Sequence, residues 1–208
     1  MRSIPDAAVE FVRRHEGCVL RVYDDLRPRA TLKAADPVLG ALTAGYGHTG
    51  PDLRIGMVVT PALAEAWLKE DLHTAADRLY RRIGGVADEL TTNQYAAMLS
   101  FVFNLGVDGP MATATIWKRL RARQFDQVPL EMMKFVHAQG HKLQGLVERR
   151  AAEVALWSAA EPGSAPGAPP SSVTRLAETP ATPSEPAPAR KSVTVWAAAG
   201  SAVAAAFA

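Results

Sequence analysis

The sequence has little cysteine and little net charge, and its opening residues contain no long apolar run. Its single cysteine, Cys18, excludes an intramolecular disulfide and fits synthesis in a reducing compartment. A formal net charge of +2, with no basic stripe, argues against a nucleic acid partner. The opening residues MRSIPDAAVEF lack the apolar core of a signal peptide, so we expect export to depend on another component.

Composition divides the chain into three parts. Residues 1–160 are long enough for one folded domain with a real core. Residues 161–191, rich in proline, alanine and serine, are expected to form a disordered linker. Residues 192–208 are uncharged and mostly alanine, and as a helix they would reach only about 26 Å. This tail is either a weak membrane segment or a weakly helical end of a soluble protein.

Two carboxylates near the start of the chain have the spacing of an active site. A helix is expected over about 4–16, opened by a Ser3 capping box, so Glu16 would lie on its last turn before Gly17. A β-rich run follows and ends at Asp25, while Asp24 is not excluded by charge alone. Hydrolysis of a glycosidic bond requires one neutral and one ionised carboxylate on opposite sides of a cleft.

Helical periodicity predicts an α+β, mainly α, architecture. Thr60 and Pro61 start a long helix that ends before Gly84 and spans about 33 Å, enough to connect two lobes. A second capping box, at Thr91 and Gln94, opens a helix expected to form the central core. Further helices are expected over about 116–120, 130–135 and 146–157.

Three blocks of the sequence carry a family resemblance. Glu16 and Asp25 are followed by GALTAGYGHT at 40–49, then QYAAMLSFVFNLG at 94–106 and GHKLQGLVERRAAEVALW at 140–157. In this order they resemble the phage-type lysozymes, the endolysins among the glycoside hydrolases. The resemblance implies a lysozyme-like two-lobe fold, with a small β-hairpin lobe and a helical lobe joined by a long helix.

The resemblance also implies hydrolysis of the β-1,4 bond between N-acetylmuramic acid and N-acetylglucosamine in bacterial peptidoglycan. The alternatives are a lytic transglycosylase and an inactive peptidoglycan-binding module. We expect a monomer made in the cytoplasm of a bacterial (phage or prophage) host, acting on the cell wall after release through a holin or through the tail.

One segment departs from the family pattern. Eighteen positions separate Asp25 from Thr43, so residues 26–39 are interpreted as an insertion in the hairpin. Asp36, seven positions before Thr43, therefore competes with Asp25 for the second carboxylate role. Asp25 keeps the family spacing from Glu16 and is favoured.

The remaining candidates surround these carboxylates. The hydroxyl of Thr43 could hold a water, and we count Thr43 with Glu16 and Asp25 as catalytic. The amide of Asn104 could bind sugar hydroxyl or acetamido groups. Tyr46 and His48 are further candidate substrate-binding residues, although a structural role for His48 stays open.

No metal and no cofactor are expected. His48 has no second ligand at a zinc spacing, and Gly140 argues against an intact helix between His137 and His141. Arg149 and Arg150 could pair with a cleft carboxylate, but at least one of them is expected at the surface.

Overall fold

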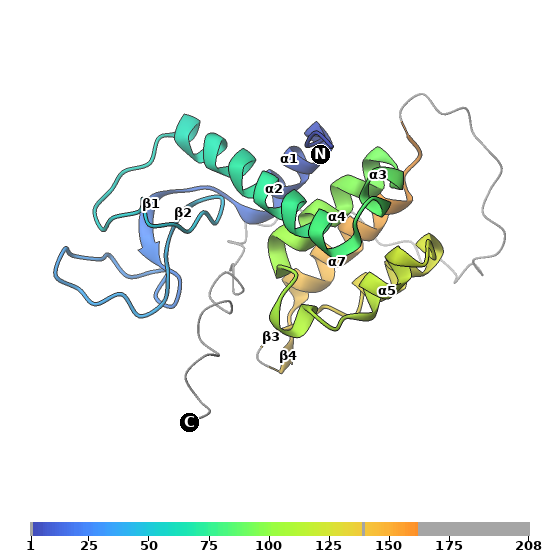
Figure 1. Ribbon diagram of the computed structural model, residues 1–208. Helices are drawn as coiled ribbons and strands as arrows, with labels where there is room; N and C mark the ends of the chain where they lie inside the picture. The colour runs from blue at the N-terminus through green and yellow to red at the C-terminus, as the bar shows by residue number, and fades with distance from the viewer. Residues whose placement is uncertain (1, 139, 162–208) are drawn as a thin grey trace, which may run out of the picture.

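The computed structural model describes residues 2–138 and 140–161 (Figure 1). The predicted tail at 192–208, and the predicted linker apart from residue 161, lie outside the described residues. The α-helices and β-strands, in chain order, are α1 (Asp6–Glu16), β1 (Val19–Asp24), β2 (Leu42–Gly45), α2 (Pro61–Ile83), α3 (Val86–Glu89), α4 (Thr92–Leu105), α5 (Thr115–Arg121), α6 (Val128–Met132), β3 (His137–Ala138), β4 (His141–Lys142) and α7 (Gln144–Ser158).

The long helix α2 joins two hydrophobic cores, as predicted. Thr60 caps it by accepting a hydrogen bond from the backbone N–H of Leu63, Pro61 occupies its first turn, and Gly84 ends it with φ 62°. Its first turns place Trp67 in the core of the small lobe, while Leu68 and the residues after it belong to the core of the helical lobe. Figure 1 shows α2 extending from the β1–β2 hairpin to the bundle of helices.

Helix α4 forms the centre of the helical lobe. Thr91 and Gln94 make the predicted capping box, and almost every side chain from Tyr95 to Val102 is buried. The helix contacts α1, α2 and α7, which enclose it in the lobe. Such full burial explains why its sequence is apolar on more than one face.

The small lobe is built on an antiparallel hairpin. Strand β1 pairs with β2 so that Tyr23 lies opposite Thr43 and Asp24 lies opposite Leu42. The register shifts between Val19 and Tyr23, which marks an irregularity in β1. This arrangement confirms the predicted α+β, mainly α, two-lobe fold.

Two local predictions need correction or refinement, and one pair of strands was missed. Helix α1 begins at Asp6 after Pro5, which makes no side-chain cap, so the Ser3 capping box is absent. The helix expected over 130–135 is the shorter α6, and Leu130 is 62% exposed because it points away from the core. The β3–β4 pair was not predicted at all.

Within the described residues, no helix is both long and apolar enough to span a membrane.

Candidate active site

Glu16 ends helix α1 and points into the helical lobe. Gly17, with φ 63°, turns the chain immediately after it, a conformation that residues with a side chain rarely adopt. The Glu16 side chain is only 1% exposed and forms an ion pair with the guanidinium of Arg149 on α7. A buried carboxylate is therefore held at the point where the chain leaves the helical lobe for the hairpin.

Arg149 belongs to a buried cluster of charges. Its Nε lies 3.3 Å from Oε1 of Glu153, which also accepts hydrogen bonds from Ser100 Oγ at 2.7 Å and from Arg150 Nη2 at 2.8 Å. Burial lowers the pKa of Arg150 to about 10 against the charge of Glu153, so Arg150 stays protonated at neutral pH. Both arginines are buried, so the expectation that one lies at the surface is wrong.

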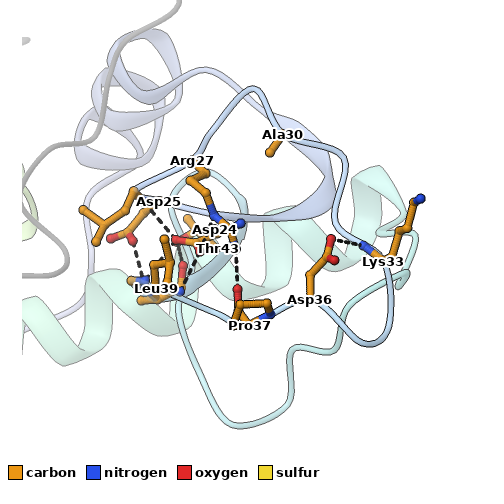
Figure 2. A network of polar contacts seen from close by, with 12 residues as sticks. Asp24, Asp25, Arg27, Ala30, Lys33, Asp36, Pro37, Leu39 and Thr43 are labelled. Carbon is orange, nitrogen blue, oxygen red and sulfur yellow. Dashed lines mark hydrogen bonds and ion pairs between the residues drawn. The ribbon is translucent and has the colours of Figure 1, made fainter.

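Asp25 directly follows β1 and lies beside Ala41, the residue before β2. Its backbone N–H donates to the carbonyl of Ala41 at 3.0 Å, and its Oδ1 accepts the backbone N–H of Ala41 at 2.8 Å. Thr43 is 1% exposed, and its hydroxyl donates to the same Ala41 carbonyl at 3.3 Å. The structure thus brings Asp25 and Thr43 together around the backbone of Ala41, the residue before β2 (Figure 2).

Tyr23 lies within electrostatic range of both carboxylates. Burial raises the pKa of its phenol, and the negative charges of Glu16 and Asp25 raise it further. The charges of both carboxylates therefore act on the Tyr23 hydroxyl. Sequence reasoning missed Tyr23 as a site residue, and its position two residues before Asp25 was the only signal.

Asp36 is part of the inserted loop and is separate from this group. Its Oδ2 accepts the backbone N–H of Lys33 at 2.8 Å, which closes a local turn. Figure 2 shows Asp36 and Lys33 together, on the other side of the loop from Asp25. This position supports Asp25 over Asp36 as the second carboxylate.

His48 is enclosed by other side chains. Its Nδ1 lies 3.0 Å from Asp71, its Nε2 lies 3.3 Å from Asp52, and its ring stacks on Trp67 with centroids 4.5 Å apart. Burial raises the pKa of Asp71, and the histidine counteracts that rise. These contacts describe a structural hydrogen-bonding group that joins the hairpin to α2. A substrate contact by His48 stays a prediction.

Tyr46 and Asn104 also have protein partners. The Tyr46 hydroxyl donates to Glu65 at 2.9 Å; burial and this hydrogen bond raise the pKa of the phenol to about 12. The Oδ1 of Asn104 accepts a hydrogen bond from Arg150 Nη2 at 3.0 Å, which connects the end of α4 to the buried cluster. Sugar binding by either residue stays a prediction. Among the described residues, no three histidine, cysteine, aspartate or glutamate side chains form a candidate metal site.

Comparison with known proteins assigns this arrangement to a family. The family model described as phage lysozyme matches residues 13–153. The chain belongs to the phage lysozyme family. An endolysin of Acyrthosiphon pisum secondary endosymbiont phage 1 is 35% identical over 161 residues, which cover 76% of this chain and 99% of the relative. A SAR-endolysin of Escherichia phage Mu is 36% identical over 124 residues, covering 58% of this chain and 68% of the relative.

A muramidase domain and a phage lysozyme of known structure have a similar fold. The muramidase domain of SpmX from Asticaccaulis excentricus aligns with a TM-score of 0.62 at 26% identity, covering 77% of this chain and 100% of that domain. A P22 lysozyme variant aligns with a TM-score of 0.60 at 26% identity, covering 76% of this chain and 100% of that protein. Both carboxylates described above lie within the residues that the family model matches.

Proposed function

We propose that this phage lysozyme is an endolysin that hydrolyses the β-1,4 bond between N-acetylmuramic acid and N-acetylglucosamine in bacterial peptidoglycan. The observation that carries the proposal is the placement of Glu16 at the end of α1 and of Asp25 directly after β1, with the charges of both acting on Tyr23. The names endolysin and muramidase among its relatives support the same activity.

Glu16 is the proposed general acid. Its side chain is buried at the end of α1, where Arg149 fixes its orientation. A buried carboxyl group can transfer a proton to the leaving glycosidic oxygen without competition from bulk water. Arg149 also forms an ion pair with Glu153, so one positive charge faces two carboxylates.

Asp25 is the proposed second carboxylate and acts on the sugar carbon. The hydrogen bond from the Ala41 N–H holds Asp25 at the edge of the hairpin. There its negative charge would stabilise the developing positive charge at the sugar carbon or activate a water. Thr43, bound to the Ala41 carbonyl, is the proposed residue that helps to hold this water.

Rates on purified peptidoglycan test these roles. We expect Glu16→Gln to lower turnover by about 10²–10⁴-fold, because the amide keeps the shape but cannot donate the proton. Asp25→Asn should also lose orders of magnitude, whereas Asp36→Asn serves as the matched control with a small effect. Near wild-type clearing of cell walls by Glu16→Gln would refute the assigned chemistry, and a larger loss in Asp36→Asn than in Asp25→Asn would refute the choice of carboxylate.

We further propose a monomer that is made in the bacterial cytoplasm and reaches the wall either through a holin or by means of residues 192–208. Fractionation of cells that produce the full chain, or a chain ending at Glu161, separates these routes. If the tail enters the membrane, only the full chain should sediment with membranes and resist extraction by salt. A full chain found wholly in the soluble fraction would contradict the anchor and leave the holin route.

A further inference from the structure

Asp24, next to the proposed second carboxylate, is a fully buried charged residue with a separate set of partners. It is 0% exposed. Its Oδ1 accepts the backbone N–H groups of Leu26 and Gly40, each at 3.0 Å, and its Oδ2 accepts that of Leu39 at 2.8 Å. The guanidinium of Arg27 completes the set, with Nη2 at 3.2 Å from Oδ2.

These partners keep the carboxylate ionised and occupied. Burial alone would raise the pKa of Asp24, but the three amide donors and Arg27 outweigh burial and lower it. A buried carboxylate without such donors would destabilise the fold. Both oxygens of Asp24 therefore already accept hydrogen bonds from the protein. A residue that exchanges protons or contacts a sugar needs an oxygen that is available to the substrate.

The donors come from both ends of the inserted loop. Leu26 and Arg27 begin the loop, whereas Leu39 and Gly40 bring the chain back to β2, so one carboxylate holds the two ends together (Figure 2). The returning chain then reaches Ala41, whose N–H is bonded to Asp25. The orientation of Asp25 thus depends on the position of the returning chain.

Additional contacts keep the loop folded along its length. Arg27 also donates to the carbonyl of Pro37, and Arg21 on β1 donates to the carbonyls of Pro28 at 3.2 Å and Ala30 at 3.4 Å. Both loop halves therefore remain close to the hairpin that carries Asp25. A loop fastened in this way can transmit the geometry of its base to the neighbouring carboxylate.

We propose that Asp24 is a positioning residue, which sets the orientation of the Asp25 carboxylate by holding together the two ends of the inserted loop. This inference rests on the proposed catalytic role of Asp25. It separates two adjacent aspartates that the sequence does not distinguish by charge. One would act on the substrate, and the other would act only through the backbone.

Gly40 offers a second way to disturb the same geometry. A Cβ at this position would lie 1.9 Å from Oδ1 of Asp25, 2.8 Å from Cγ of Leu26 and 3.0 Å from Oδ1 of Asp24. The Gly40→Ala substitution would therefore displace the carboxylates without removing any charge. Gly85→Ala is the matched control, because nothing lies within 4 Å of its added Cβ.

The test compares kcat and KM on soluble peptidoglycan fragments. Asp24→Asn replaces one acceptor oxygen with an amide donor that faces backbone N–H groups, so the loop base should open. A misplacement of about 1 Å can cost about 10²-fold in rate, so we expect kcat to fall by about 10- to 100-fold with KM within about twofold. Gly40→Ala should likewise lower kcat and leave KM nearly unchanged. Asp36→Asn and Gly85→Ala should leave both constants unchanged.

Hydrogen exchange shows whether the effect arises at the loop base. In Asp24→Asn the amides of Leu26, Leu39 and Gly40 should exchange faster, while those of α4 should keep wild-type protection. If Asp24→Asn fails to fold, Gly40→Ala decides on the same criteria. A folded Asp24→Asn or Gly40→Ala protein with wild-type kcat would overturn the proposal.

Asp25→Asn distinguishes failure of this inference from failure of the proposed function. An inactive Asp25→Asn together with a fully active Asp24→Asn would overturn only the positioning role. An active Asp25→Asn would remove the catalytic assignment on which the positioning role rests, and would overturn both.

Discussion

Arg149 joins the proposed general acid to the core of the helical lobe, and its replacement by methionine is the strongest perturbation of that link. The substitution keeps an unbranched apolar chain but removes the charge that faces Glu16 and Glu153, whose side chains are 1% and 0% exposed. Breaking a buried ion pair on one side costs about 3–5 kcal/mol, because the other charge stays buried without its partner. For a domain of this size, that corresponds to a fall in Tm of about 6–20 °C.

Thermal unfolding followed by circular dichroism measures this effect, with Arg14→Met on α1 as the matched control. Arg14 lies 2.9 Å from Glu10, but its side chain is 72% exposed, so the pair should contribute little to stability. We expect Arg149→Met to melt far below Arg14→Met and to lose activity, since Glu16 loses its orienting partner. If the two variants melted within about 2 °C of each other, the buried cluster would not have the structural importance argued above.

Three further predictions concern stability. Thr91→Ala should lower the free energy of unfolding by about 1 kcal/mol in urea titrations, because it removes the cap of α4. A chain ending at Glu161 should unfold at higher urea concentration than one ending at Ala160, because the Glu161 carboxylate accepts the backbone N–H of Asn93 at 3.0 Å; equal midpoints would contradict this. The pKa of Asp24 is lowered by folding, so its stabilisation is present above its unfolded pKa of about 3.9 and is lost as pH falls through the folded pKa. Unfolding free energies measured from about pH 5 to pH 2 should therefore fall less steeply for Asp24→Asn than for the wild type.

Features that depend on neighbouring residues were predictable from the sequence. The side chains of Thr60 and Thr91 accept hydrogen bonds from N–H groups three residues later. The residues that predict these caps are therefore the same residues that form them. The division of α2 between two cores follows from its length and apolar stripe. The spacing of Glu16 and Asp25 likewise placed both carboxylates at the ends of regular elements.

Features that depend on distant partners were not predictable. The sequence suggested that Arg149 could pair with a cleft carboxylate, but Arg149 and Glu16 are 133 positions apart, and nothing in a single helix indicates that both side chains will be buried. The role of Asp24 depends on N–H groups of Leu39 and Gly40, 15 and 16 positions later, whose return depends on the fold of the insertion. Charge and local spacing therefore suggested the two carboxylates as candidates but did not predict their environment.

The nature of the released sugar ends tests the central claim most directly. Purified peptidoglycan is digested by the wild-type chain in water enriched in heavy oxygen, and the fragments are analysed by mass spectrometry. Hydrolysis by Glu16 and Asp25 predicts reducing N-acetylmuramic acid ends that carry one heavy oxygen from water, with no such ends from Glu16→Gln. Anhydro ends without heavy oxygen, or equal release by Glu16→Gln, would contradict the account.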